Sequence, residues 1–196
     1  INAPTSGDIS SGYLVYQGST VRGGFYTNPT HGMTHISDNY HTFRNNNANR
    51  MTIDSNGYVT TPYQPGFYAR LHASFNSTTD GAEIVPASSF NSQWNTGGGF
   101  SGNRFTAPVA GKYMFIFSAE KANNYVSVAV ALSIFKNGSE FPNARLYQSN
   151  QNTRKTLQYT MIMDMAVNDY AEPFIYSYQT GSVYDNRGHF AGYLIG

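Results

Sequence analysis

The chain has 196 residues with 12 basic and 11 acidic side chains, so its formal net charge is +1 at pH 7. A nearly neutral chain lacks the basic field that binds a phosphate backbone, which argues against nucleic acid as a partner. The absence of cysteine excludes thiolate catalysis, zinc–thiolate sites and disulfides. The 19 Gly, 16 Tyr and 13 Phe, with abundant Asn, Ser and Thr, favour strands and turns over helices, so we expect an all-β fold.

The sequence also argues against membrane insertion and against a complete chain. The longest apolar stretch, residues 125–135, is interrupted by Ser127 and Ser133, and it is shorter than the roughly 18 residues that a bilayer span requires. The chain begins with Ile1-Asn2-Ala3-Pro4, without an initiator methionine or the profile of a signal peptide. We therefore interpret it as a fragment of a longer protein.

Residues 1–62 have the pattern of an extended region. They contain no Lys and no Glu, and short strand-like pieces such as 13–16 and 51–53 lie between clusters of Gly, Asn and Ser. The four Asn within 45–49 are typical of a disordered segment when taken alone. Short polar strands become stable when neighbouring chains supply ladder partners and apolar faces. We predict that residues 1–62 are a fibre stem of short β segments that requires trimerisation.

A boundary follows at Thr61-Pro62-Tyr63-Gln64-Pro65-Gly66, where two prolines and a glycine fall within six residues. Beyond it, the period-2 alternation of buried strands begins. Residues 113–119 predict a strand covered on both sides, because Tyr113, Phe115 and Phe117 share one face and Met114 and Ile116 share the other.

Further strands are predicted along the rest of the chain. Residues 126–134 carry Val126, Val128, Val130, Leu132 and Ile134 on one face, and Asn137-Gly138 then predicts a tight hairpin because both residues tolerate positive φ. Residues 157–167 alternate likewise, Asn168-Asp169 predicts a turn into residues 174–178, and residues 190–195 predict a last strand. Many short strands without a helical pattern predict a jelly-roll β-sandwich over residues 63–196.

One stretch of this second region resembles a known family. Phe105, Pro108, Gly111, Tyr113 and Phe115 have the spacing Phe-x-x-Pro-x-x-Gly-x-Tyr-x-Phe, which is similar to the globular head of complement component 1q and its tumour-necrosis-factor-like relatives. Three further pieces occur along the chain in the same order as in that family: Pro65-Gly66-Phe67, Lys136-Asn137-Gly138 and Phe190-x-Gly192-Tyr193-Leu194. The resemblance covers about residues 63–196. Asn168-Asp169 departs from it, since relatives usually have Gly-Asp there.

This resemblance implies a ten-stranded jelly roll that assembles as a trimer, with apolar strands against the threefold axis. On that basis Met114, Ile116 and Tyr193 are candidates for the trimer interface. The first region resembles the repetitive segments that precede the tip domains of bacteriophage tail fibres, on residues 49–59 and 21–27. A fibrous stem before a trimeric head fits a virion fibre, and it does not fit a cytokine or a collagen-stemmed complement protein.

The sequence contains few signs of chemistry. Gly97, Gly99 and Gly102 satisfy G-x-G-x-x-G, but a strand rather than a helix follows, so an inter-strand loop explains them better than a nucleotide site. His31 and His35 share one side of an extended strand, and Asp80 with Glu83, like Asp169 with Glu172, lies at a turn. Each pair is a weak candidate for a metal ligand. Solvated or turn-forming side chains explain them more simply, and we expect no cofactor, no metal and no active site.

Adhesion is the function that the composition favours. Carbohydrate binding uses aromatic rings as platforms, with Asn, Asp and Arg as planar hydrogen-bond partners. Two predicted loops, 145–154 and 184–187, have this mixture, and the single tryptophan, Trp94, lies near another predicted loop. Their candidate receptor-binding residues are Tyr147, Asn150, Asn152, Arg154, Tyr184, Asp185, Asn186 and Arg187.

These observations lead to one main hypothesis and two alternatives. We expect a non-enzymatic homotrimeric adhesin at the tip of a virion fibre, which binds a host cell-surface receptor of carbohydrate or another surface polymer. A structural trimerisation cap without receptor binding is one alternative, and a glycan-degrading tail spike is the other. Three identical weak sites on one rigid head would give avidity, because later contacts form at high effective concentration.

Overall fold

The computed structural model describes residues 11–28, 32–37, 40–76, 81–121, 129–141, 145–148, 154–177 and 183–196. Within these ranges the chain consists of β-strands, turns and one short 3-10 turn at Ala87–Ser89, which confirms the all-β prediction. No helix in the described part of the chain has the length and apolarity to cross a bilayer. Contacts divide the chain into two compact units, Ile1–Pro62 and Tyr63–Gly196.

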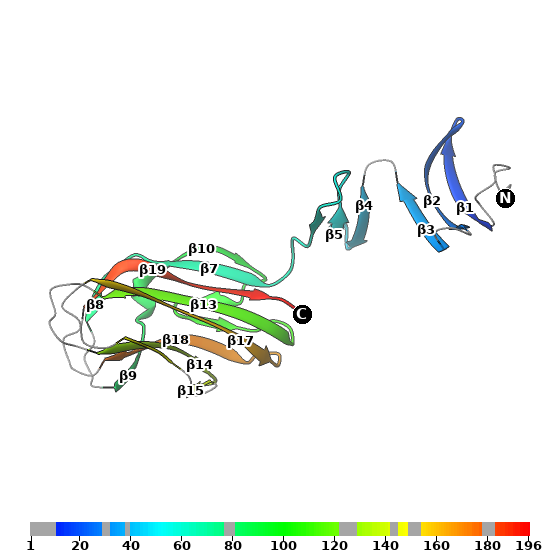
Figure 1. The fold of residues 1–196 in the computed structure, drawn as a ribbon. Helices are drawn as coiled ribbons and strands as arrows, with labels where there is room; N and C mark the ends of the chain where they lie inside the picture. Colours follow the sequence, from blue (N-terminus) through cyan, green and yellow to red (C-terminus); the bar gives the residue numbers. More distant parts are fainter. Residues whose placement is uncertain are drawn as a thin grey trace. The chain divides into compact units, whose positions relative to one another are not determined.

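The first unit contains two antiparallel three-stranded sheets (Figure 1). One sheet is formed by β1 (Ser11–Gln17), β2 (Thr20–Asn28) and β3 (Gly32–Ser37), and the other by β4 (His41–Asn45), β5 (Ala48–Ile53) and β6 (Val59–Thr60). Asn46 and Asn47 form the turn between β4 and β5 with φ values of 49° and 59°. The Asn-rich run that is typical of disorder when taken alone thus forms a tight hairpin, because paired asparagines tolerate the positive φ of its turn.

The described part of the first unit has no apolar core of its own. None of its described side chains belongs to the cluster of buried apolar residues. The side chains of Tyr40, Phe43 and Tyr58 are instead 58%, 58% and 69% exposed. Aromatic rings in these strands thus meet solvent within a single chain.

The second unit is a sandwich of two antiparallel sheets (Figure 1). The first sheet has the order β10-β7-β19-β13-β17, with β8 paired to β19. The second sheet has the order β11-β12-β18-β14-β15, with β16 paired to β14 and β9 to β18. Their bounds are β7 (Gly66–Leu71), β8 (Phe75–Asn76), β9 (Gly81–Ile84), β10 (Phe90–Thr96), β11 (Phe100–Ser101), β12 (Arg104–Thr106), β13 (Gly111–Lys121), β14 (Val130–Lys136), β15 (Ser139–Glu140), β16 (Leu146–Gln148), β17 (Lys155–Met165), β18 (Tyr170–Ser177) and β19 (Val183–Leu194).

The predicted strands of this unit are confirmed where the structure describes them. The strand expected over 113–119 lies within β13, that over 157–167 corresponds to β17, and β14 contains residues 130–134 of the strand expected over 126–134. Residues 126–128 lie outside the described ranges. Residues 184–187 are predicted to form a loop, and that prediction is wrong because they belong to β19. Tyr184 pairs with β13 and β8 and Asp185 pairs with β13, whereas residues 186–187 lie in a β-bulge between Asp185 and Gly188.

The core between the sheets is dominated by aromatic rings. Tyr113, Phe115 and Phe117 are fully buried, as the alternation predicts. The Phe67 ring lies at the centre, with its centroid 4.5, 5.0, 6.4 and 5.0 Å from those of Phe100, Phe105, Phe115 and Phe190. A Cβ at Gly192 would lie 2.6 Å from Phe67 Cε1 and 2.7 Å from Phe115 Cδ1. The motif glycine therefore leaves room for two core rings.

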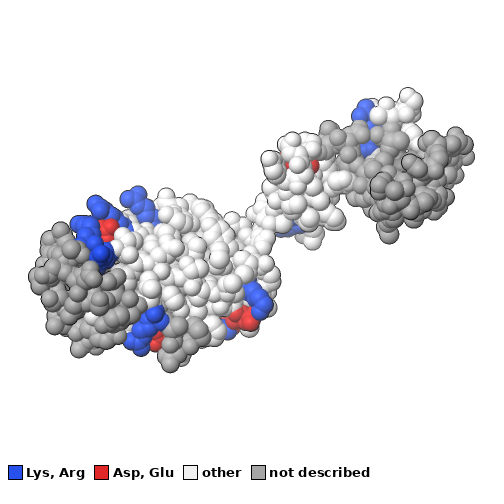
Figure 2. Space-filling model, in the orientation of Figure 1, with Lys and Arg blue, Asp and Glu red and all other residues white. Residues whose placement is uncertain are grey.

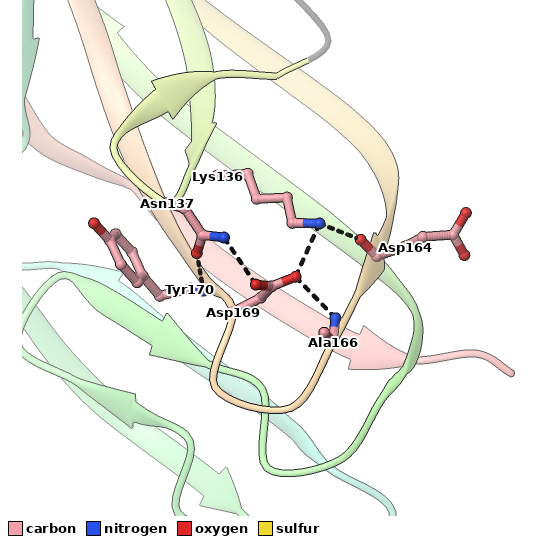
Figure 3. Close-up of polar contacts among 6 residues, drawn as sticks. All are labelled: Lys136, Asn137, Asp164, Ala166, Asp169 and Tyr170. Atoms are coloured by element: carbon pink, nitrogen blue, oxygen red, sulfur yellow. Dashed lines mark hydrogen bonds and ion pairs between the residues drawn. The ribbon is translucent and has the colours of Figure 1, made fainter.

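Two turns at one end of the sandwich are locked together (Figure 3). Asn137 and Gly138 form the predicted hairpin with φ values of 51° and 78°, and Asn168 has φ 70° where relatives usually have glycine. The Asp169 carboxylate accepts hydrogen bonds from the Asn137 amide (2.8 Å) and the backbone N–H of Ala166 (2.8 Å), and it pairs with Lys136 Nζ (2.9 Å). These contacts lower the pKa of Asp169 to about 2.

Candidate functional site: the outward face of the first sheet

The outward face of the first sheet carries a band of apolar side chains. Strand register places Met114 beside Tyr193 on one side and Ile162 on the other. In the next row Ile116 lies beside Ala191, which in turn pairs with Tyr68, and Tyr68 pairs with Trp94 of the edge strand β10. Side chains from five strands thus form one continuous surface, which we call the apolar face: Tyr68, Trp94, Met114, Ile116, Ile162, Ala191 and Tyr193.

Much of the apolar face is open to solvent in the single chain. The side chains of Ile162, Trp94 and Tyr193 are 56%, 39% and 38% exposed. The rings of Trp94 and Tyr193 lie with their centroids 5.4 Å apart. Contiguous exposed apolar area of this kind marks an interaction surface.

The face contains all three residues proposed for the trimer interface. Met114, Ile116 and Tyr193 are brought together by the pairing of β13 with β19. Sequence reasoning missed Ile162 and Tyr68, although alternation places Ile162 on the face opposite to the buried Met163. Trp94 was expected near a loop, and it lies within β10.

A polar row crosses the sheet beside the apolar face. Ser118 Oγ lies 3.0 Å from His189 Nδ1, and the backbone N–H of His189 donates to the same oxygen at 3.1 Å. The Tyr68 ring stacks on the imidazole with a centroid distance of 5.4 Å. Burial lowers the pKa of His189 below its ordinary value. This pair links β13 to β19 through side chains as well as through the ladder.

A charged cluster follows, at the Glu120 end of β13. The Glu120 side chain is 11% exposed, and it pairs with the guanidinium groups of Arg154 and, at 3.3 Å, Arg187. Thr156 Oγ1 donates to its other oxygen at 3.2 Å. Burial acts to raise the pKa of Glu120, but the hydrogen bonds and charges of these partners outweigh burial and lower it. Two candidate receptor-binding residues from separate segments therefore meet on one carboxylate.

Charged groups elsewhere on the second unit also occur in small mixed clusters. Figure 2 shows that Lys and Arg side chains on the visible face lie close to Asp or Glu side chains, with uncharged surface between the groups. Arg187 remains the more accessible arginine at Glu120, with 64% of its side chain exposed against 38% for Arg154.

The other candidate residues are distributed as follows. Tyr147 lies in β16 opposite Ala131, and Tyr184 and Asp185 lie in β19 opposite Lys121 and Glu120. Asn186 is exposed in β19. Asn150 and Asn152 lie outside the described residues. The structure therefore gathers Arg154, Asp185, Asn186 and Arg187 near the Glu120 end, whereas Tyr147 belongs to the second sheet.

The weak metal candidates do not meet among the described residues. His35 lies in β3 opposite Phe25, and Glu83 lies in β9 opposite Ile175. His31 and Asp80 fall outside the described ranges, and within those ranges no group of three or more His, Cys, Asp or Glu could hold a metal ion. Glu172 pairs with Arg104 at 2.7 Å, and both oxygens of Asp169 accept hydrogen bonds from turn residues.

Comparison with known proteins is informative at the level of fold. No protein-family model and no curated protein matches the chain. Murine APRIL at pH 5.0 aligns with a TM-score of 0.51 and 9% identity, over 67% of this chain and 99% of its own. The globular domain of zebrafish complement 1qA protein aligns with a TM-score of 0.48 and 16% identity, over 68% and 98%. Eiger TNF from S. frugiperda aligns with a TM-score of 0.44 and 9% identity, over 68% and 94%.

The likeness to APRIL covers nearly all of that domain. It shows that the second unit has the fold of that protein, and this agrees with the two-sheet jelly roll predicted for residues 63–196. The two sheets have six and seven described strands rather than ten in total, because several strands have only two or three residues and are separated by turns.

Proposed function

We propose that the chain is the tip of a virion fibre: a non-enzymatic homotrimeric adhesin with a stem at residues 1–62 and a receptor-binding head at residues 63–196. The observation that carries this proposal is the apolar face of the first sheet. Its Trp94, Tyr193 and Ile162 side chains are more than one third exposed in the single chain. A threefold assembly that buries these faces against one another removes them from water.

The first unit supports the same assembly. Its described strands have exposed aromatic rings and none of its described side chains joins the buried cluster. In the proposed trimer, strands of the other two copies cover these rings. The stem then gains the stability that three-stranded sheets without a core lack on their own.

Receptor binding in this proposal uses the end of the head that carries Glu120. The Arg154 and Arg187 guanidinium groups are held by Glu120, so they are positioned before a ligand arrives. Preorganised donors lose less conformational entropy on binding. Three copies of the cluster on one rigid head give avidity even when each contact is weak.

Sedimentation tests the assembly. We expect a trimer for the unchanged chain and a shift to monomer for Ile162→Glu, because an unpaired carboxylate is costly to bury in an apolar interface. Val167→Glu is the matched control, since Val167 is 53% exposed in a turn outside the apolar face. A well-ordered monomer at micromolar concentration would contradict the proposal.

Binding to intact host cells tests the adhesive role. The purified trimer is expected to bind, and Arg187→Ala is expected to weaken binding while the trimer persists. An inert trimer would identify a trimerisation cap instead. Release of reducing ends from host polysaccharide would identify a glycan-degrading spike.

A further inference from the structure

The outward face of the second sheet carries an aromatic stripe that the proposed interface leaves uncovered. Ala171 and Ile175 of β18 belong to the buried core, so the alternate residues of β18 face the other way. Phe135 of the neighbouring strand β14 adds a ring to this face. The aromatic stripe consists of four rings, of which Tyr176 is buried and the others are half-buried: Phe135, Tyr170, Phe174 and Tyr176.

An arginine lies over the tyrosine at each end of the stripe. The Arg104 guanidinium carbon is 3.9 Å from the centroid of the Tyr170 ring, and that of Arg145 is 3.7 Å from the centroid of Tyr176. Stacking over an aromatic face fixes a guanidinium through electrostatic attraction to the ring. The side chains of the two arginines are still 48% and 36% exposed.

A glutamate completes each of these end groups. Arg104 Nε and Nη2 contact Glu172 Oε1 at 2.8 and 2.7 Å. Arg145 Nε and Nη2 donate to the two oxygens of Glu140 at 3.1 and 3.2 Å, and the Tyr176 hydroxyl donates to Glu140 Oε2 at 2.9 Å. Each end therefore presents an exposed guanidinium whose charge is balanced by a nearly buried carboxylate, 6% exposed at Glu172 and 10% at Glu140.

Two stacked rings lie between the end groups. The centroids of Phe135 and Phe174 are 3.7 Å apart with an interplanar angle of 11°, and Phe135 also lies 6.5 Å from Tyr176. Both phenylalanines are half-buried. From Tyr170 to Tyr176 the stripe follows six residues of one strand, or about 20 Å at roughly 3.3 Å per residue.

These features fit a neutral polyhydroxylated chain. A hydroxyl oxygen accepts a hydrogen bond from a guanidinium N–H and brings no charge that the paired arginines would have to balance. The C–H faces of sugar rings are apolar, and they suit the phenylalanine pair. Each arginine is paired with a glutamate, so these four groups give the stripe no net charge and an anionic polymer gains no general attraction.

We infer that the aromatic stripe is a binding site for a neutral glycan on the host surface, with Arg104 and Arg145 as hydrogen-bond donors and Phe174 as part of the stacking platform. The inference rests on the proposed receptor-binding function, and it names the chemistry of the receptor and a second surface of the head. Each trimer then presents three stripes on its outside, one per subunit.

The test uses the full chain as a trimer and an array of neutral and anionic oligosaccharides, followed by titration with the best neutral ligand. Phe174→Leu removes the ring and retains apolar volume, and Arg104→Lys retains the charge and removes the planar fork. Tyr63→Phe is the matched control, because Tyr63 is 53% exposed on the head outside the stripe. Thermal unfolding and sedimentation of each variant establish that the trimer is intact.

We expect binding to neutral oligosaccharides with little dependence on salt. Phe174→Leu and Arg104→Lys should each weaken it by about fivefold or more, with the control unchanged. Preference for anionic glycans with steep salt dependence would overturn the inference, as would unchanged binding in both variants. Binding to host cells that survives periodate oxidation and is lost on protease treatment would indicate a protein receptor and overturn it, while the proposed adhesin would stand. A trimer that binds neither glycans nor cells would contradict both.

Discussion

Substitution of Gly192 by alanine tests whether the aromatic core is packed to its limit. The added Cβ would lie 2.6 Å from Phe67 Cε1 and 2.7 Å from two atoms of the Phe115 ring. Carbon atoms prefer separations of about 3.5 to 4.0 Å, so a ring must move by about 1 Å. Neither ring has open space, because both are fully buried and Phe67 stacks on Phe100 at 4.5 Å.

The expected cost follows from this geometry. Extra methyl groups in a well-packed core destabilise proteins by about 1–3 kcal/mol, and we expect Gly192→Ala to lie at the upper end, near 3 kcal/mol. The measurement is urea unfolding followed by tyrosine and tryptophan fluorescence, at equal protomer concentration for every variant, because the stability of an oligomer depends on concentration.

Two further variants make the result specific. Gly196→Ala is the control, since a Cβ there has nothing within 4 Å, and we expect no change. The double variant Gly192→Ala/Phe67→Leu should lose less stability than the sum of its single variants, because the smaller side chain makes room for the methyl group. A Gly192→Ala protein within about 0.5 kcal/mol of the unchanged chain would refute the claim that this glycine is required by packing.

Three other predictions concern the polar groups of the second unit. Asn168 has φ 70°, so Asn168→Gly should preserve stability. Asn168→Ala should lower the unfolding free energy by about 1 kcal/mol in urea titrations, because alanine is strained at positive φ. Equal stability of the two variants would contradict this. The pKa of Asp169 is lowered from 3.8 to about 2, so its contribution to stability is complete above the unfolded value and is lost as the pH falls from about 4 to 2. The unfolding temperature of Asp169→Asn should therefore depend less on pH in this window. If the unfolding temperatures of the variant and the unchanged chain fall equally between about pH 4 and 2, the prediction is wrong. Glu120→Gln should lower the free energy of unfolding by about 2 kcal/mol. The substitution weakens the charge-assisted bonds to Arg154 and Arg187 and leaves the two cations facing each other. No change in the urea midpoint would show that the cluster is not stabilising.

Local signals determined much of the fold. Alternation in 113–119 and 157–167 depends on which side of a strand each side chain occupies, and that is set by the backbone period of two. Asn137-Gly138 specifies its hairpin because both residues accept positive φ at low cost. Asn168 takes a positive φ in its turn for the same reason. These features depend on residues close together in the chain, so sequence patterns are sufficient to predict them.

The partners in space were decided by the tertiary structure. Residues 184–187 have a turn-like composition, yet β13 and β8 pair with Tyr184, β13 pairs with Asp185, and the other two residues form a bulge within β19. Arg104 and Glu172 are 68 residues apart, and Glu120 meets arginines from two other segments. Such contacts depend on the order and register of strands across the sandwich, which no local propensity encodes. The sequence therefore determined the strands with clear alternation and the turns with Asn or Gly at positive φ, and the packing of the two sheets decided which side chains meet on each outer face.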